Sequence, residues 1–328
     1  MAIDKSDDLG LPLLGVDPGA RGHSMANFSE LLFELFGLVD AKTILEVGAY
    51  AGDLTEVLAD WLAPGGGKVI AIDPKPQEAL VKLAAQNEAV ELDERLSLDA
   101  LGSLPDAEVV VIDGDHNYFT VSAELRALSP KLAGDSPPLV LLHDVCWPHG
   151  RRDAYYDSSR IPPEGLPHAV EVGYLKPDDR GVADEGLGFA DHELAEREGG
   201  PRNGILTALE DFVAQVDESL RYAVVPAFFG LGVLWNTNAR WASDVERTLE
   251  PLDRNPVLVR LERNRVQQMV EAACLEARLL RQANERSALL EELQMSRAFR
   301  IGDFVARLRH PRRGRSWKER LDGLIEDG

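Results

Sequence analysis

The stretch ILEVGAYAGDLT, residues 44–55, decides the fold that we expect for this chain. It places Glu46 at the end of a short apolar run, followed by Gly48 and Gly52 around a tight turn that leads into a helix. Asp73 ends the next apolar run, 25 residues after Gly48. Such a glycine turn lets the backbone approach a ligand closely, and an acid after the second strand can accept both hydroxyls of a ribose. The spacing therefore predicts a nucleotide-type cofactor site.

The residue at position 50 discriminates between two classes of cofactor. A dinucleotide requires G-x-G-x-x-G so that its pyrophosphate lies against bare backbone, but the second glycine position is Tyr50. A bulky side chain there favours a ligand that has adenosine but no phosphate, such as S-adenosylmethionine, whose ammonium group Glu46 is placed to attract. Ser97 and Asp99, near the next strand end, are candidates for contact with the adenine edge. Since G-x-x-x-G also occurs as a plain tight turn, the prediction depends on its combination with Glu46 and Asp73.

Four short, nearly continuous apolar runs alternate with helix-like segments. Such runs are typical of strands that are covered on both faces. They predict a doubly wound α/β fold, in which an open, mostly parallel, Rossmann-like sheet has helices on both sides. A helix is expected over Phe28–Leu38, and an antiparallel hairpin around Phe229–Gly230 is expected to close the sheet. The four runs are TILEV from Thr43, KVIAID from Lys68, EVVVID from Glu108 and PLVLLHD from Pro138.

Acidic and histidine side chains follow two of these runs. Asp113 ends one run and Asp144 ends the next, so a parallel sheet would bring both carboxylates to the edge that carries the cofactor turn. Paired carboxylates can hold a hard divalent cation that polarises a substrate hydroxyl. His116, an imidazole with an ordinary pKa near ~6.5, is the candidate to take the proton from that hydroxyl. The cluster therefore predicts a catalytic metal site.

The same residues have structural alternatives. Asp113 can hydrogen-bond loop amides, and Asp115 is a candidate cap for the helix that begins near Tyr118. His143 neighbours Asp144 and is a candidate third metal ligand. Adjacent side chains on a strand point to opposite faces, however, so a core position for His143 is equally open.

Composition and charge exclude some classes of protein. A chain of 328 residues with 45% hydrophobic content can fill a sizeable core. Its net charge of -21 disfavours nucleic acid as a partner and favours a compact neutral or cationic substrate. The two cysteines, Cys146 and Cys274, have no metal-ligand spacing and predict no disulfide framework. We expect a cytoplasmic location, because the sequence shows neither a signal-peptide pattern nor a run of ~18 apolar residues.

The chain is expected to divide into four segments. An N-terminal segment, 1–27, precedes a cofactor-binding domain, 28–250, which contains a lid or acceptor insertion at about 146–202. A long helix is expected over 251–295 and a basic amphipathic tail over 296–328. Apolar residues among the arginines of the tail predict peripheral contact with an anionic membrane at its inner face, and docking on the acidic body of the protein is an equally open alternative.

The long helix is also expected to form a coiled coil, and through it a homo-oligomer. One heptad frame supports this prediction, although Glu276 and Ser287 interrupt it. The frame places inward Val266, Met269, Ala273, Leu280, Ala283 and Leu290.

With these motifs assembled, the chain resembles class I S-adenosylmethionine-dependent methyltransferases over about residues 28–236. It is most similar to the metal-dependent macrocin and mycinamicin sugar O-methyltransferases and to the related cephalosporin-hydroxylase-like branch. The resemblance is carried by LEVGAYAG, AIDP, VVIDGDH and LLHDV. It implies a sheet of seven strands. The chain departs from the pattern at one place, because relatives commonly have two adjacent acids where this chain has His143 and Asp144.

The resemblance also implies roles for individual residues. It assigns cofactor binding to Glu46, Gly48, Gly52 and Asp73, with Tyr50 in the same turn and Asp99 as a further candidate, and base catalysis to His116, with Asp113 beside it. It assigns the divalent metal to Asp113 and Asp144, and His143 would add a nitrogen ligand that suits manganese better than magnesium. The insertion resembles that of members found among polysaccharide-building proteins, so a glycan acceptor is expected. Arg151, Arg152 and Tyr155 are candidates to line its site, and surface packing is an equally good account of them.

We therefore expect an S-adenosylmethionine-dependent O-methyltransferase, assisted by a divalent cation, that methylates a hydroxyl of a sugar, glycan or glycosylated metabolite. The alternative is a non-catalytic scaffold of the same fold, oligomerised by its coiled coil in a glycan-assembly complex. An oxidoreductase would bind NAD, which Tyr50 disfavours.

Overall fold

The computed structural model describes residues 24–188, 192–216 and 219–309 of the chain. Its centre is a seven-stranded sheet in which every neighbouring pair is parallel except the two pairs that involve β12. The fold class predicted from the sequence is therefore confirmed. In spatial order the strands are β11 (Leu220–Val225), β12 (Leu231–Asn236), β5 (Leu139–Leu142), β4 (Val109–Ile112), β1 (Thr43–Val47), β2 (Lys68–Ile72) and β3 (Val90–Asp93).

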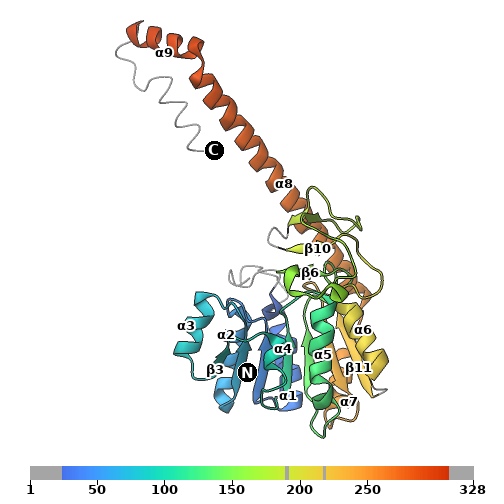
Figure 1. Cartoon of the computed structure of the whole chain (residues 1–328). Helices are drawn as coiled ribbons and strands as arrows, with labels where there is room; N and C mark the ends of the chain where they lie inside the picture. The colour runs from blue at the N-terminus through green and yellow to red at the C-terminus, as the bar shows by residue number, and fades with distance from the viewer. Residues whose placement is uncertain (1–23, 189–191, 217–218, 310–328) are drawn as a thin grey trace.

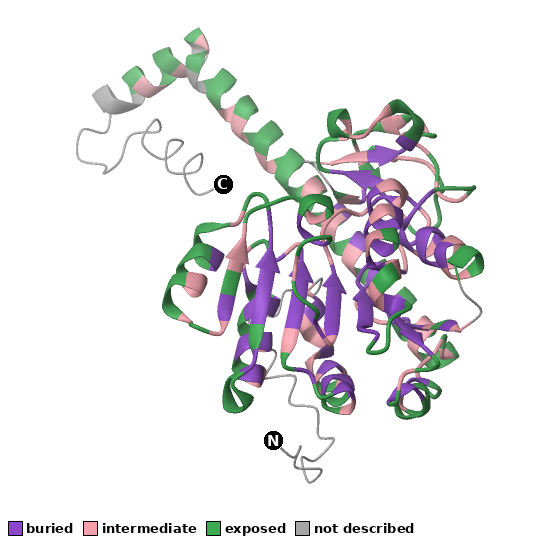
Figure 2. Cartoon of the chain, turned by 60° about the horizontal axis from the view of Figure 1, so that its bottom comes forward, coloured by how far each residue is buried: buried purple, intermediate pink, exposed green. Residues whose placement is uncertain are grey.

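Helices cover both faces of this sheet, which explains why its strands are almost continuously apolar (Figure 2). Successive residues of a strand point to opposite faces, so Ile44 of β1 packs in one core and Leu45 in the other. One face carries α1 (Ser29–Val39), α2 (Asp53–Leu62) and α7 (Ala242–Leu249), and the other carries α4 (Ser97–Ala100), α5 (Tyr118–Leu132) and α6 (Ile205–Val216). Helix α3 (Glu78–Gln86) lies beside β3, and short 3-10 helices span Met25–Phe28 and Ala63–Gly65.

The central strand β1 sets the position of the functional edge. It pairs with β2 on one side and with β4 on the other, so the chain changes direction across the sheet at this point. The register places Val47 opposite both Ile72 and Ile112, and Ile112 opposite Leu142. Four strands therefore end level with one another, and the residues that follow them are brought together, as expected at the switch point of an open α/β sheet.

The insertion between β5 and α6 is built of very short strands at the end of the sheet from which the long helix projects (Figure 1). A three-stranded sheet contains β6 (Ala154–Tyr155), β10 (Glu193–Ala195) and β7 (Val170–Glu171), and a two-stranded sheet contains β8 (Tyr174–Leu175) and β9 (Leu187–Gly188). Two 3-10 helices, Ser158–Arg160 and Pro163–Gly165, complete it.

The long C-terminal helix α8 (Pro256–Met295) begins on the body of the protein and projects away from it (Figure 1). Its first half buries Val266, Val270 and Cys274, whereas its second half is largely exposed (Figure 2). The heptad frame read from the sequence is therefore wrong in its first half, because Val266 packs within its own chain. A coiled coil stays a prediction.

Helix α9 (Arg297–Arg309) follows α8 at an angle and contains the first part of the basic tail (Figure 1). The rest of that tail, from residue 310, and the N-terminal segment up to residue 23 lie outside the described residues. Contact of the tail with an anionic membrane stays a prediction. Within the described ranges, no helix combines the length and the apolar character that crossing a membrane requires.

Gly48 is a position in the fold that leaves no space for a side chain. Its φ is +86°, and a Cβ atom would lie 2.2 Å from the carbonyl oxygen of Asp113. We expect Gly48→Ala to lower the free energy of unfolding by more than about 2 kcal/mol, because left-handed strain and a backbone clash add together.

Urea unfolding of both the variant and a matched control checks this expectation. Gly102→Ala introduces the same methyl group where nothing lies within 4 Å, and it should change stability by no more than about 1 kcal/mol. Equal effects of the two substitutions would contradict the close approach of β1 and β4 at this turn.

Candidate functional site

Four side chains from the ends of β4 and β5 meet in one cluster, which we call the carboxylate-histidine cluster: Asp113, His116, His143 and Asp144. The Nδ1 atom of His143 lies 3.3 Å from Oδ1 of Asp113 and 3.7 Å from Oδ1 of Asp144. The Nε2 atom of His116 lies 3.1 Å from Oδ2 of Asp144 and 3.8 Å from Oδ1 of Asp113. The structure thus brings together all four residues that the sequence proposed for catalysis and metal binding.

The backbone after β5 explains how His143 and Asp144 both face this cluster. Strand β5 ends at Leu142, and Asp144 adopts a left-handed φ of +57°. The alternation of side chains along a strand no longer applies beyond that point. His143 is buried, as the alternative reading of the sequence allowed, yet its ring still contacts Asp113.

The imidazole of His143 is held at both nitrogens. Nδ1 faces Asp113, and Nε2 lies 2.9 Å from the carbonyl oxygen of Phe228, to which it can donate a proton. The ring of Phe28 packs edge-on at 6.3 Å between centroids. Histidines that ligate metals usually donate their other N–H to a carbonyl or carboxylate, which fixes the ring orientation. His143 therefore has the surroundings of a metal ligand through Nδ1.

Helix α8 supports the turn that provides this carbonyl group. The two carboxylate oxygens of Glu262 accept hydrogen bonds from the backbone N–H groups of Phe228 (3.0 Å) and Phe229 (2.7 Å). Both phenylalanines have positive φ, at +45° and +67°, a conformation that needs outside support in residues other than glycine. Arg265 forms an ion pair with Glu262 at 2.6 Å. The long helix is thus connected to the cluster through one carboxylate and one turn.

Charges within the cluster stabilise each other. Burial opposes the charged form of His143, but the carboxylates of Asp113 and Asp144 outweigh it and raise its pKa to about 9. For His116, burial likewise acts against the charge, and the neighbouring groups raise its pKa well above the ordinary value. Burial alone would raise the pKa of the Asp144 carboxyl, but the two histidines lower it strongly.

The cofactor turn lies directly beside the cluster. Gly52 caps the N-terminus of α2 with a φ of +88°, and Tyr50 also has positive φ, with its side chain 56% exposed. The carboxylate of Asp73 accepts hydrogen bonds from the backbone N–H groups of Tyr50 and Lys75, each at 2.8 Å. Asp73 therefore fixes the turn itself, a role that the sequence did not indicate. Both oxygens retain acceptor capacity, so a contact with ribose stays a prediction.

Glu46 occupies the buried end of β1, between the turn and the cluster. It is 2% exposed, and its Oε2 atom has no hydrogen-bond partner among the described residues. Burial raises the pKa of this carboxyl to about 8. An unsatisfied buried carboxyl is costly, and a cationic group of a bound molecule would compensate it. The fit to the ammonium group of S-adenosylmethionine is therefore supported by an observation in this structure.

The two residues proposed to contact the adenine ring, Asp99 and Ser97, are less favourably placed for cofactor binding than Glu46. Asp99 is exposed on α4, and its carbonyl group lies 3.5 Å from the guanidinium of Arg95. Ser97 is partly buried and lies close to the fully buried carboxyl of Glu124, whose pKa burial raises to about 8. A role for Asp99 in cofactor binding stays a prediction.

Arg151, Arg152 and Tyr155 each have a partner within the protein, and their role in lining an acceptor site stays a prediction. Arg152 is 1% exposed and donates to the carbonyl groups of residues 180 and 195. Arg151 forms an ion pair with Glu210 at 2.6 Å. The hydroxyl of Tyr155 donates to Asp153 at 2.7 Å. The partners of Arg151 and Arg152 are far away in the sequence, whereas Tyr155 pairs with a residue two positions before it.

The cap of α5 also differs from the expected one. The side chain of Asn117 accepts a hydrogen bond from the N–H of Thr120 at 2.8 Å and caps the helix. Asp115 instead accepts from the hydroxyl of Thr120 at 3.2 Å.

The sequence reasoning missed three rings of the insertion that lie over the cluster. His149 is 3% exposed and stacks on His116, with centroids 4.8 Å apart and planes 3° from parallel. Tyr156 lies 6.0 Å from the His116 ring, and His192 lies 4.2 Å from Tyr156. Burial and the nearby His116 lower the pKa of His149 to about 3, so this ring is neutral. The only sequence signal was the density of rings in WPHGRRDAYYD, from Trp147.

The cluster fits a divalent cation. Asp113, His143 and Asp144 each offer one ligand atom, and these atoms lie within 4.8 Å of one another. Two carboxylate oxygens and one imidazole nitrogen suit manganese, iron or zinc better than magnesium. Within the described ranges this is the one group of three such residues that could hold a metal ion.

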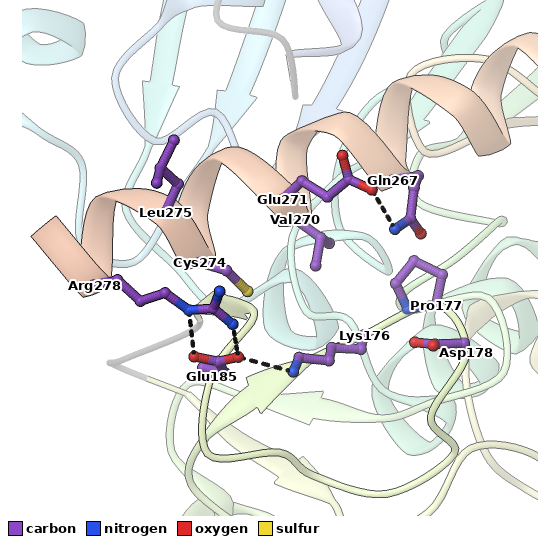
Figure 3. A pocket seen from close by; sticks show the side chains of 10 residues that line it. All are labelled: Lys176, Pro177, Asp178, Glu185, Gln267, Val270, Glu271, Cys274, Leu275 and Arg278. Carbon is purple, nitrogen blue, oxygen red and sulfur yellow. Dashed lines mark hydrogen bonds and ion pairs between the residues drawn. The ribbon is translucent and has the colours of Figure 1, made fainter.

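A separate cavity of about 380 Å³ lies between the insertion and α8 (Figure 3). None of its lining residues belongs to the carboxylate-histidine cluster or to the cofactor turn. Glu185 crosses it and forms ion pairs with Lys176, Arg278 and Arg281. The remaining lining residues are Pro177, Asp178, Gln267, Val270, Glu271, Cys274 and Leu275.

Comparison with known families points to a methyltransferase. Residues 45–145, less than a third of the chain, match a family model described as a methyltransferase domain. This range contains the cofactor turn and the whole carboxylate-histidine cluster. The prediction of a methyltransferase domain is thereby confirmed, whereas the narrower resemblance to sugar O-methyltransferases stays a prediction. No curated protein matches the sequence.

Several solved structures are distantly similar. A methyltransferase of Podospora anserina, PaMTH1, solved with bound SAH, is 16% identical over 67% of this chain and 82% of that chain, with a TM-score of 0.42. A putative O-methyltransferase from Klebsiella pneumoniae is 17% identical over 65% and 81%, with a TM-score of 0.36. The O-methyltransferase TomG from Streptomyces achromogenes is 16% identical over 66% and 87%, with a TM-score of 0.38. At TM-scores below 0.5 these similarities carry no information about activity.

The raised pKa of His143 predicts a pH dependence of stability in the metal-free protein. The folded pKa, about 9, exceeds the ordinary value of 6.5, so the stabilisation is complete below about pH 6.5 and is lost as the pH rises through 9. In EDTA, the free energy of unfolding should therefore fall between these values.

Urea titrations at several pH values check this. His143→Gln should show a smaller fall, whereas His168→Gln, which removes a histidine outside the cluster, should keep the wild-type profile. A parallel fall in wild type and His143→Gln would show that His143 does not carry the effect.

Proposed function

We propose that the chain is an S-adenosylmethionine-dependent O-methyltransferase that uses a divalent cation and methylates a hydroxyl of a sugar, glycan or glycosylated metabolite. The observation that carries this proposal is the direct contact between the cofactor turn and the carboxylate-histidine cluster. Gly48 and the Asp113–Gly114 backbone approach so closely that a Cβ atom on Gly48 would lie 2.2 Å from the Asp113 carbonyl oxygen. A methyl donor in the turn and an activated hydroxyl at the cluster would therefore be neighbours.

Each residue has a distinct part in this proposal. Glu46 would bind the ammonium group of the cofactor, and Gly48 and Gly52 would let the cofactor approach the backbone. Asp113, His143 and Asp144 would hold the cation, which when bound polarises the acceptor hydroxyl and offsets the carboxylate charges that raise the pKa of His116. The Nε2 atom of His116 would then take the hydroxyl proton.

The acceptor class is supported by the rings over the cluster. Tyr156 is 56% exposed, and its ring lies 6.0 Å from that of His116. An exposed aromatic ring offers an apolar face together with a polar hydroxyl, which suits the mixed surface of a sugar. His149 and His192 flank it. Recognition would therefore depend on Tyr156.

Methyl transfer from labelled S-adenosylmethionine to a panel of sugars, polysaccharides and glycosylated metabolites tests the proposal. We expect His116→Gln and Asp113→Asn to lower kcat at least about 100-fold, because general-base and metal-assisted catalysis contribute factors of that size. His168→Gln should retain activity. EDTA should abolish turnover, and Mn²⁺ should restore it better than Mg²⁺.

Two outcomes would contradict it. Cofactor binding without methylation of any acceptor would favour the alternative, a non-catalytic scaffold of this fold. Full activity in EDTA would show that methyl transfer needs no divalent cation. It would contradict the proposed metal site but not the proposed methyltransferase activity.

Binding of S-adenosylhomocysteine tests the role of Glu46 independently of turnover. The carboxyl is protonated below its pKa of about 8, and an ammonium group prefers the carboxylate. Affinity should therefore increase with pH, by up to about tenfold per unit, from pH 6 until it levels near pH 8.

Isothermal titration calorimetry in two buffers of different ionisation enthalpy would measure the release of the proton. Glu46→Gln should weaken binding and flatten its pH dependence, whereas His168→Gln, outside the site, should leave both unchanged. A loss of affinity in Asp99→Asn would support the sequence prediction that Asp99 binds the cofactor.

A further inference from the structure

The second half of α8 is largely exposed (Figure 2), and it carries leucines that the body of the protein does not cover. A lone helix normally exposes polar residues on all sides, so exposed leucines that recur along one face indicate a binding surface. The exposed fractions are 58% for Leu275, 57% for Leu279, 66% for Leu289 and 50% for Leu293.

These leucines lie on one face of the helix. At 3.6 residues per turn, the six positions Leu275, Leu279, Gln282, Arg286, Leu289 and Leu293 all fall within about 40° of a single line. We call this set the leucine stripe. The buried residues Val266, Val270 and Cys274 lie on the other side of α8, and Figure 3 shows Leu275 projecting away from them. The body therefore occupies one side of the helix and leaves the stripe free.

The order of residues in the stripe is symmetric. The intervals along the chain are 4, 3, 4, 3 and 4 residues, which are those of a coiled-coil seam. The types read Leu, Leu, Gln, Arg, Leu, Leu, so the stripe has the same pattern of apolar and polar positions in both directions about Asn284. A surface of this kind is complementary to itself under a two-fold rotation.

We propose that the stripe is covered by a second copy of this chain, with the two α8 helices antiparallel. Leu275 would then pack against Leu293 of the second copy, and Leu279 against Leu289 of the second copy. The polar pair Gln282 and Arg286 would meet at the centre, where a polar layer fixes register and orientation.

Charge favours the antiparallel arrangement over the parallel one. Parallel helices in register would place Arg286 against Arg286 of the second copy, a like-charge contact. Antiparallel helices place it against Gln282 instead. Glu285 would lie near its own symmetry mate at the centre, with both Arg286 side chains beside the pair.

The length of the stripe indicates a weak dimer. From Leu275 to Leu293 the helix rises about 27 Å, which gives an interface at the small end of the usual range. We therefore expect a monomer-dimer equilibrium that depends on protein concentration. This association is independent of the proposed catalytic function, because no residue of the stripe lies in the carboxylate-histidine cluster or the cofactor turn.

Sedimentation velocity of the full chain over a concentration series tests the association. Leu279→Glu should shift the equilibrium to monomer, with at least a tenfold higher dissociation constant. Leu280→Glu is a matched control. Leu280, which the heptad frame read from the sequence placed inward, is 58% exposed on the same helix but points away from the stripe. The control should dimerise like wild type, and circular dichroism should show equal helix content in both variants. A wild type that stays monomeric, or equal effects of the two variants, would overturn the proposal.

Cross-linking tests the orientation. In a background in which Cys146 and Cys274 are replaced by serine and alanine, Leu279→Cys and Leu289→Cys proteins carrying different tags are mixed and oxidised. The antiparallel arrangement predicts a disulfide between the two different proteins and none between two copies of either one. Disulfides only between identical copies would overturn the antiparallel arrangement.

Discussion

The close approach of Gly48 to the carbonyl group of Asp113 is the constraint on which the rest of the site depends. It joins the turn after β1 to the end of β4 with no space for a side chain between them. The register of β1 with β4 makes this contact unavoidable, because Val47 and Ile112 end level. A ligand in the turn is therefore a neighbour of any group that the end of β4 carries.

The free-energy cost of burying two carboxylates and two histidines at this edge is offset by the hydrogen bonds and opposite charges around each group. His143 illustrates this, since its ring is fixed by Asp113 on one side and by the Phe228 carbonyl on the other. The cluster is thus organised before any ligand binds, which favours both metal binding and catalysis.

The same turn connects the cluster to the long helix. Glu262 of α8 supports the backbone of Phe228 and Phe229, and the carbonyl group of Phe228 orients His143. The stalk of the molecule is therefore in structural contact with its candidate active site through a short series of hydrogen bonds.

Much of the architecture was determined by the sequence alone. Continuous apolar runs indicate strands that are covered on both faces, so the sheet could be predicted. The glycine turn and the acids that follow the strands indicate a binding site at the carboxyl ends of the strands, so the turn and the members of the cluster could be predicted as well. Strand β3 was not recognised from its own residues, because only Val90 of its four residues is buried. Tertiary structure decided the orientation of Asp144, which depends on one left-handed backbone angle. It also decided the role of Arg152, whose partners lie 28 and 43 residues away in the sequence. It also decided which face of α8 is free, since heptad spacing gives the period of a helix but not the side on which its own body packs.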